Sequence, residues 1–201
     1  MKVFFDFDGT LTTKDSLLPF LLFVVGWPRF VLKSIFILPL ICRYFFNRNL
    51  RGQVKNKALL LYLSKYTPTQ LEQFVTQFID SILPRMMRPE GMAILEKHVK
   101  NGDECILVSA SINLYLVPWA KQNHFTHVIA TPFLGTPPLM IGQNCYGEEK
   151  VDQILKQYPQ IQTENCYAYG DTIGDIPMLK LAKKGFMWSN KQQQFIEINA
   201  K

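Results

Sequence analysis

The sequence lacks the residue patterns of a thiolate metal site. Four cysteines are present, namely Cys42, Cys105, Cys145 and Cys166. They form no Cys-x-x-Cys pair and have no histidine at metal-ligand spacing, so they are typical of ordinary core or reduced thiols. Two of the three histidines, His124 and His127, stand where a helix end runs into a strand, which favours a structural role. We therefore expect no zinc site.

Long uncharged hydrophobic runs are also missing, although 48% of the residues are hydrophobic and only 19% are charged. The most apolar segment, residues 15–46, contains three prolines and the cations Arg29, Lys33 and Arg43. No uncharged run in it reaches the roughly 18 to 20 residues that a membrane-spanning helix needs. The segment is therefore predicted to form a pair of buried or interfacial helices.

A signal peptide is not expected, because a strand with two aspartates occupies the first eight residues and leaves no room for basic, apolar and cleavage regions. We expect a cytoplasmic protein, with a peripheral position at the inner face of the membrane as a further option. The net charge of +6 attracts anions, and both phosphate esters and anionic lipid surfaces fit it. Nucleic acid does not, because the basic residues are scattered rather than gathered with aromatic residues into a stripe.

The first chemical signal is a pair of aspartates, Asp6 and Asp8, between an apolar strand and the turn at Gly9. Because side chains alternate along a strand, residues i and i+2 face the same way and both carboxylates can converge at the strand's carboxyl edge. Two carboxylates that close repel each other unless a cation lies between them. A hard ion such as Mg²⁺ accepts oxygen ligands and binds substrate phosphate, so the pair indicates phosphoryl chemistry.

A second strand also ends in a glycine and an acid, at Gly170 and Asp171. Asp171 would add an oxygen to the metal's ligands. Asp175 follows one helical turn later, near enough to bind a metal-bound water or to hold Lys150. The alternative for both acids is that they cap the helix that follows.

The order of the elements predicts an α/β fold: a Rossmann-like, three-layer core with a parallel sheet and an inserted helical cap. Residues 2–7 read as a buried strand, and the next strand, 104–109, comes nearly a hundred residues later. Helices and strands then alternate: helix 112–123, strand 127–130, a proline-rich loop at 131–144, helix 147–157, strand 165–169, helix 174–183 and strand 185–188. Such alternation argues for a parallel sheet covered on both faces, with ligands outside the carboxyl ends of its strands.

The long gap between the first two strands is the predicted cap. It spans residues 15–83, and the core comprises residues 1–14 and 84–201. Helical spacing over 50–66 and 67–83 adds two helices to the pair expected before them, with Thr67 as an N-cap. Together these four helices make a four-helix type of cap.

Two further segments can contact a phosphate. Ser109-Ala110-Ser111 follows an apolar strand and leads into a helix, so its hydroxyl and N–H groups can face an anion. Serines in this place are also common helix caps. Lys150 lies in the first turn of a helix, an unfavourable place for a cation beside the helix dipole, which indicates an anion in front of it. A solvated surface lysine fits the local pattern equally well.

Taken together, four motifs resemble those of the haloacid dehalogenase superfamily of phosphohydrolases in order and approximate spacing. They are Asp6-Phe7-Asp8-Gly9-Thr10-Leu11-Thr12, Val108-Ser109-Ala110-Ser111, Lys150, and Gly170-Asp171-Thr172-Ile173-Gly174-Asp175. The resemblance covers essentially the whole chain. The helical insertion resembles the cap of the phosphoserine-phosphatase-like branch (subfamily IB). Segments such as Pro118-Trp119-Ala120 resemble bacterial hydrolases of that branch that include phosphatidylglycerophosphatase C.

The resemblance implies a phosphomonoester hydrolase with an aspartyl-phosphate intermediate. Asp6 would be the nucleophile, and the Asp8 side chain would protonate the leaving group and then activate water. Mg²⁺ would be held by the Asp6 carboxylate, the Asp8 backbone carbonyl and Asp171, with Asp175 in a supporting role. The phosphate would be bound by Ser109, the Ala110 N–H and Lys150.

The substrate is left open between soluble and lipid phosphates. Asp15 occupies the stretch where phosphoserine phosphatases place an acid for the amino group, which keeps an amino-acid phosphate in view. Two departures weaken that reading, because Ala110-Ser111 replaces the paired glycines of that activity and Gly174 replaces its usual asparagine.

An apolar cap could instead rest in an anionic membrane interface and admit a lipid phosphate such as phosphatidylglycerophosphate. Its flanking cations are Arg29, Lys33, Arg43, Arg48 and Arg51. The alternative is that Phe20, Phe23 and Phe36 form the cap's own core. A phosphotransferase and a noncatalytic membrane-surface protein are the other functions that we keep in view.

Overall fold

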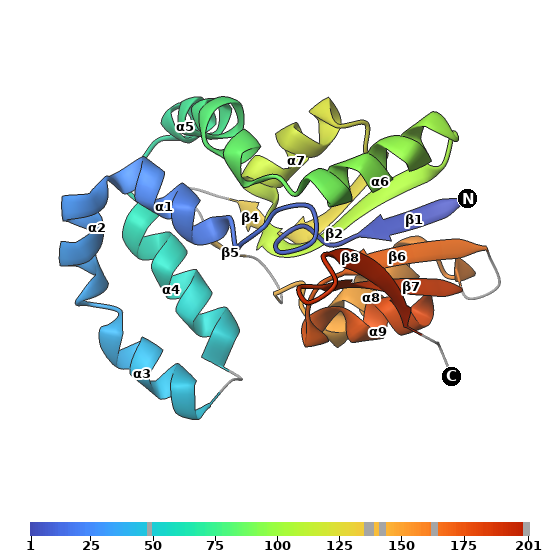
Figure 1. Ribbon diagram of the computed structural model, residues 1–201. Helices are drawn as coiled ribbons and strands as arrows, with labels where there is room; N and C mark the ends of the chain where they lie inside the picture. Colours follow the sequence, from blue (N-terminus) through green and yellow to red (C-terminus); the bar gives the residue numbers. More distant parts are fainter. Residues whose placement is uncertain (48–49, 135–138, 141–143, 162–164, 199–201) are drawn as a thin grey trace.

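A six-stranded sheet forms the centre of the computed structural model, which describes residues 1–47, 50–134, 139–140, 144–161 and 165–198 (Figure 1). Its strand order is β3-β2-β1-β6-β7-β8. These strands are β1 (Lys2–Phe5), β2 (Glu104–Ile112), β3 (His127–Thr131), β6 (Cys166–Gly170), β7 (Lys184–Ser189) and β8 (Gln194–Ile198). Neighbours pair in parallel except β7 and β8, which are antiparallel. The α/β fold class is confirmed, but the antiparallel edge strand was not predicted.

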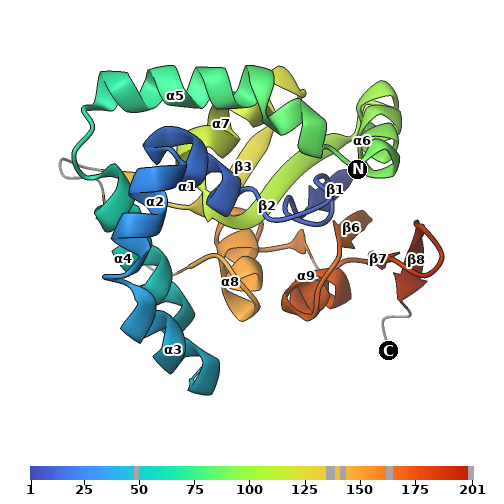
Figure 2. The same cartoon turned by 60° about the vertical axis from the view of Figure 1, so that its left-hand side comes forward.

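Strand β1 lies at the centre because its apolar side chains alternate between the two faces of the sheet. Val3 and Phe5 join a large hydrophobic cluster on one face, and Phe4 joins a smaller cluster on the other. The first face is covered by α6 (Pro89–Lys100) and α7 (Asn113–Gln122), and the second by α8 (Glu148–Gln157) and α9 (Ile176–Leu181) (Figures 1 and 2). These three layers direct the carboxyl ends of β1, β2 and β6 toward the same edge.

Five α-helices lie between β1 and α6 in the described part of the chain, where the sequence predicts four. They are α1 (Leu17–Val25), α2 (Trp27–Ser34), α3 (Leu38–Phe46), α4 (Arg51–Leu63) and α5 (Pro68–Ser81). The pair predicted within residues 15–46 is wrong, because that segment forms three helices. Pro28 and Pro39 each lie in a first turn, where proline is tolerated, and so begin new helices.

Helix α5 ties the insertion to the core. Its predicted N-cap is confirmed: Thr67 Oγ1 accepts a hydrogen bond from Gln70 N, and the Gln70 side chain accepts one from Thr67 N. The ring of Phe78 packs against Phe20 of α1 and Tyr115 of α7, with centroids 5.2 and 5.7 Å apart. One hydrophobic cluster therefore runs from the sheet into the inserted helices.

Helices α2, α3 and α4 project beyond the carboxyl edge of the sheet in both views (Figures 1 and 2). Within the described residues, no single helix combines the length and hydropathy that a membrane span requires. Helices α1 and α2 meet that criterion only as a pair, and they are bent by 111° where they join.

The proline-rich stretch at 131–144 is not wholly loop. Its described residues include two short antiparallel strands, β4 (Phe133–Leu134) and β5 (Leu139–Met140). Residues 135–138 and 141–143 of this stretch lie outside the described residues, as does Arg48, one of the cations predicted to flank the cap.

Candidate active site

A buried lysine joins two of the predicted acids at the carboxyl edge of the sheet. Lys150 Nζ lies 2.5 Å from Asp6 Oδ1 and 2.6 Å from Asp175 Oδ1, and its side chain is 1% exposed. This burial rules out the solvated alternative for Lys150. The N–H of Asp6 donates to Tyr169 O at the end of β6. The parallel pairing of β1 with β6 therefore sets Asp6 beside the loop that carries Asp171 and Asp175.

Asp175 also organises that loop. Its Oδ2 accepts hydrogen bonds from Asp171 N at 3.2 Å and from Thr172 N and Oγ1, each at 3.0 Å. Gly170 makes this approach possible, because a Cβ at that position would collide with the side chain of Asp175. Asp175 thus belongs to a capping box, as the helix-capping alternative predicted. It also binds Lys150.

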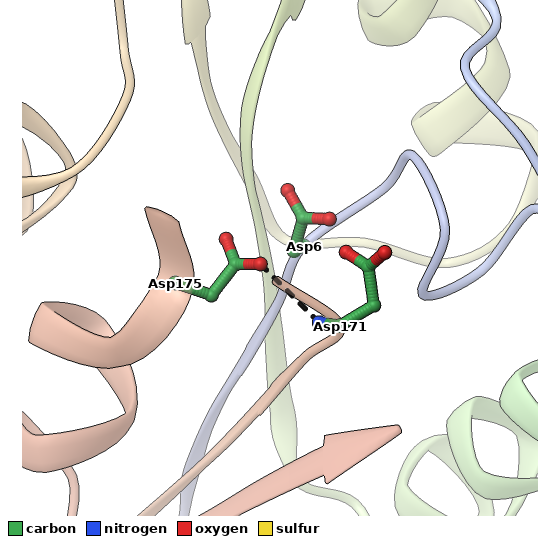
Figure 3. Close-up of side chains that lie close together, drawn as sticks. All are labelled: Asp6, Asp171 and Asp175. Carbon is green, nitrogen blue, oxygen red and sulfur yellow. Dashed lines mark hydrogen bonds between the residues drawn. The ribbon is translucent and has the colours of Figure 1, made fainter. Parts of the chain in front are cut away.

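Asp171 completes a cluster of three carboxylates with Asp6 and Asp175 (Figure 3). One oxygen from each lies within 4.8 Å of the others. Asp171 Oδ1 is buried and has no hydrogen-bond partner among the described residues. Gly9, whose φ is +84°, leaves room for it, since a Cβ there would collide with the Asp171 carboxylate. A buried carboxylate oxygen without a donor, beside two more carboxylates, fits a hard cation such as Mg²⁺.

The charges of this cluster do not balance. Burial first, and then repulsion from Asp175, raises the pKa of Asp6 well above its usual range and the pKa of Asp171 to about 7. Burial also acts to raise the pKa of Asp175, but Lys150 and the hydrogen bonds of the loop outweigh it, so this pKa lies below its usual range. One ammonium group faces three carboxylates, and a bound cation would relieve the repulsion that is left.

The Asp8 side chain is held separately. Its Oδ1 accepts a hydrogen bond from Ser16 N at 2.7 Å, and its Oδ2 accepts one from Ser111 Oγ. Ser16 Oγ and Tyr115 OH are in turn 2.9 Å apart. Burial, followed by repulsion from Asp15, raises the pKa of Asp8 to about 6, although its two serine partners act to lower it. Asp8 can therefore exchange a proton near neutral pH.

A bulge in β2 opens the segment predicted to bind phosphate. The pairing with β3 shifts register between Ser109 and Ile112, so Ala110 and Ser111 stand out of the ladder. Ser109 Oγ accepts a hydrogen bond from Ser111 N at 3.0 Å. Bulges are common beside active sites because they re-aim side chains. This one places the segment in the wall of the same cavity as Asp6.

Lys55, on α4, is a second cation at this place, and the sequence did not reveal it. Its Nζ donates to Ala110 O, to Asn144 Oδ1 at 2.8 Å and to Thr131 Oγ1 at 3.2 Å. Burial is the main reason that its pKa is lowered to about 8. Lys55 ties the inserted helices to the β2 bulge. No local signal distinguishes it from Lys57, because only the packing of α4 brings it there.

Two other side chains shape the site. The sequence analysis did not identify the first, Arg88. Its Nε and Nη2 donate to Gly9 O at 3.2 and 2.9 Å, and its guanidinium lies 3.9 Å from the Trp188 ring centroid. Asp15, proposed for substrate specificity, lines the cavity. Its Oδ1 also accepts hydrogen bonds from the first N–H groups of α1, at 3.0 and 3.2 Å, so it caps that helix as well.

These groups line one part of a cavity of about 700 Å³. The inserted helices supply the rest of its wall, which is mostly apolar: Leu17, Leu21, Phe30, Ile37, Ile41, Val54, Ala58 and Tyr62. A cavity of this size can hold a small organic ligand as well as a phosphate group. It has a charged part at the sheet edge and an apolar part under the insertion.

Comparison with known proteins shows to which family this chain is similar. Residues 3–180 match the haloacid dehalogenase-like hydrolases. Protein CicA of Caulobacter vibrioides is 34% identical over 193 residues, which cover 92% of this chain and 85% of that protein. Probable phosphatase Rv3661 of Mycobacterium tuberculosis is 30% identical over 190 residues, or 88% of this chain and 64% of that protein. A solved complex of phosphoserine phosphatase with substrate has a TM-score of 0.62 at 18% identity, and covers 92% of this chain and 84% of that chain.

Fold and site together define an α/β enzyme with acids at the strand ends and a helical insertion after the first strand. The chain belongs to the haloacid dehalogenase-like hydrolase family, and at this level the resemblance of its motifs is confirmed. It shares its fold with phosphoserine phosphatase and has a protein named as a phosphatase among its relatives.

Proposed function

We propose that this protein is a Mg²⁺-dependent phosphomonoester hydrolase that works through an aspartyl-phosphate intermediate. The observation that carries the proposal is the different environment of the two acids that follow β1. Asp6 lies in the carboxylate cluster with Lys150, whereas Asp8 is held by serine partners with a pKa near 6. Two carboxylates held so differently suit a nucleophile and a proton donor.

The chemical steps follow from these positions. An Asp6 oxygen attacks the phosphorus in line and forms the aspartyl phosphate as the ester oxygen leaves. Asp8 gives its proton to that oxygen. As a carboxylate, Asp8 then takes a proton from the water that hydrolyses the intermediate and restores Asp6. Ser109, the Ala110 N–H and Lys150 would stabilise the phosphoryl oxygens.

The metal fits the acids of this site. Asp6, Asp171 and the backbone carbonyl of Asp8 would hold it, which would supply the missing partner of Asp171 Oδ1. When bound, Mg²⁺ offsets the repulsion between the carboxylates and the anionic phosphate. Asp175 would support the site by fixing Lys150 and the N–H of Asp171.

We assign residues 15–83 to a cap over a core of residues 1–14 and 84–201. The cavity between the inserted helices and the strand ends supports this division, as does the bond from Lys55 to the β2 bulge. We place the protein on the cytoplasmic side, with its cap at the inner face of the membrane.

For the substrate we favour a lipid phosphate, such as phosphatidylglycerophosphate. The apolar wall that the insertion adds to the cavity supports a substrate with an apolar chain. A soluble phosphate with an amino group, such as phosphoserine, is the second candidate. It is supported by Asp15, which lines the cavity and whose negative charge acts on Asp8.

The test is Mg²⁺-dependent phosphate release from phosphatidylglycerophosphate in mixed micelles, from phosphoserine and from common soluble phosphomonoesters. We expect the highest kcat/KM with the lipid and no release by Asp6→Asn. Preference for phosphoserine would favour the second candidate. Release from none of them would favour the noncatalytic alternative, and transfer of phosphate to an added alcohol at the expense of water would make the protein a phosphotransferase.

A further inference from the structure

The outer sides of α2 and α3 carry an exposed apolar surface, which we call the α2–α3 face. Neither helix contains a buried residue. The large apolar side chains of the face are Trp27, Leu32, Ile35, Phe36, Phe45 and Phe46, with exposed fractions from 62% for Ile35 to 94% for Phe46. The alternative that Phe20, Phe23 and Phe36 form the cap's own core is confirmed for Phe20, which is fully buried, and for Phe23, which packs against the same cluster, but it is wrong for Phe36, which is 71% exposed. This many large apolar side chains exposed on two consecutive helices indicate a contact surface.

Other apolar side chains hold this segment against the rest of the protein, namely the half-buried Phe30 on α2 and the buried Ile37 between α2 and α3. Phe30 stacks on Tyr62 of α4, with ring centroids 4.7 Å apart, and Ile37 is 3% exposed. The outward residues are therefore additional to those that hold the helices in place. Because α2 and α3 project away from the sheet (Figures 1 and 2), the face can meet a large flat partner without obstruction from the core.

The charges around the face are of one sign. The sequence contains no Asp or Glu from Ser16 to Leu71. On α2 and α3, Arg29 and Arg43 are exposed. Exposed aromatic and aliphatic side chains among cations, without an acid, match an anionic lipid interface, where apolar groups enter the acyl boundary and cations meet the head groups.

A second copy of the chain fits the face less well. A two-fold contact would bring the same surface together from both copies and would oppose their arginines. Juxtaposed like charges in an interface cost several kcal/mol. The sign of the charge therefore selects an anionic surface over a homodimer.

We propose that the α2–α3 face binds the surface of an anionic lipid bilayer. Binding itself needs no chemistry at the acidic site. The same helices also wall the apolar part of the cavity, through Phe30, Ile37 and Ile41. A docked protein would hold that part of the cavity close to the acyl region, and this link to a lipid substrate rests on the proposed function.

Trp27 provides a direct probe of the face. It is 66% exposed, whereas the other two tryptophans, Trp119 and Trp188, are 4% and 5% exposed. We expect vesicles of equal parts phosphatidylcholine and phosphatidylglycerol to shift its emission to the blue and to carry the protein upward in flotation. The shift should be small with phosphatidylcholine alone and should decrease as salt rises above about 0.1 M. A Trp27→Phe variant should float but lose the shift.

Variants distinguish vesicle binding by the α2–α3 face from non-specific hydrophobic adsorption and from catalysis. Phe36→Ser with Phe46→Ser should weaken vesicle binding by about tenfold or more, because both side chains leave the acyl boundary. Val117→Ser, which removes an exposed apolar residue from α7, is the matched control and should bind as the wild type does. Neither Phe36 nor Phe46 lines the cavity, so hydrolysis of a soluble ester by the double variant should be unchanged.

Failure of the wild type to float with anionic vesicles would overturn the proposal, and so would undiminished binding by the double variant. A dimer in light scattering that the double variant abolishes, without vesicle binding, would assign the face to a second copy instead. Hydrolysis of soluble esters distinguishes these outcomes from failure of the proposed function, because an active enzyme that ignores vesicles refutes only the docking surface.

Discussion

Asp6 and Asp8 differ in what touches them, and this difference predicts different defects when each is replaced. With the roles proposed above, Asp8→Asn would keep the nucleophile and remove the proton donor, so kcat on an alkyl phosphate should fall by about 10²- to 10⁴-fold. With p-nitrophenyl phosphate, whose leaving group needs no proton, the variant should still load Asp6. Rapid mixing should then show a burst of nitrophenolate followed by slow turnover.

Asp6→Asn should give neither a burst nor turnover, because it removes the proposed nucleophile. Asp15→Asn is the control for a nearby lost charge and should turn over p-nitrophenyl phosphate without accumulating the intermediate. An Asp8→Asn variant that hydrolyses alkyl phosphates at the wild-type rate would show that another group transfers the proton.

Lys55 predicts a pH dependence of stability rather than of chemistry. Burial lowers its pKa from its usual 10.5 to about 8, with Arg51 acting in the same direction and Asp8, Asp15 and Cys145 against it. Between these values the unfolded chain binds more protons than the folded chain, so this group makes the free energy of unfolding rise with pH. In Lys55→Met, this rise in the free energy of unfolding between about pH 8 and pH 10 should be absent, as measured by urea denaturation.

The matched control for Lys55 is Lys57→Met on the same helix, because Lys57 is exposed. Its unfolding free energy should keep the wild-type dependence on pH. If the two variants behaved alike, Lys55 would not be buried at the β2 bulge.

At the scale of a single element, the N-terminal capping box of α5 makes a measurable contribution to the stability of the fold. Thr67→Ala removes the side-chain acceptor of its capping box and leaves Gln70 N without that partner. The free energy of unfolding should fall by about 1 kcal/mol, which thermal or urea denaturation can resolve. Thr76→Ala lies within the same helix, where the Thr76 hydroxyl donates back to Glu72 O, and should change stability much less.

The elements that sequence predicted are those with strong local signals. The alternation of apolar strands and amphipathic helices located the central strands, and Thr67-Pro68 located the start of α5. β8 was missed because it is a strand of only five residues, all of them partly or fully exposed. Its strand conformation depends on pairing with β7. The prediction of two helices in residues 15–46 was wrong because the prolines were counted only as breaks in an apolar segment, whereas Pro28 and Pro39 each begin a new helix.

The same distinction applies to the site. Asp6, Asp171 and Ser109 could be brought together from sequence, because each follows a strand and the ends of parallel strands meet at one edge. Lys55 and Arg88 could not, because each reaches the site from a helix or loop whose position depends on tertiary packing. Their roles come from neighbours distant in the chain: Ala110 for Lys55, and Gly9 for Arg88.

For the whole molecule, the carboxylate cluster predicts that Mg²⁺ stabilises the fold. Mg²⁺ at about a hundred times its dissociation constant should add about 2.7 kcal/mol, or roughly 5 to 10 °C in Tm for a chain of this size. Asp171→Asn should abolish this rise. It should not be less stable than the wild type without Mg²⁺, because it removes a buried carboxylate that Asp175 repels.

Asp152→Asn is the control, since Asp152 is an exposed acid on α8 outside the cluster, and it should keep the full response to Mg²⁺. An equal Tm rise in Asp171→Asn would mean that the ion binds elsewhere.

The central place of β1 in the sheet has a consequence for how the molecule forms. Lys2 pairs with Glu104 on one side and with Cys166 on the other, so β1 is made before both of its neighbours and is enclosed only after β6 has been made. Closing such long loops costs chain entropy before any contact repays it, which slows folding. During synthesis, the apolar residues from Leu17 to Phe46 emerge long before α7 and β6 exist to cover their neighbours. A nascent chain therefore exposes these apolar residues for a prolonged period, and the acidic site is complete only once Lys150, Asp171 and Asp175 have been made.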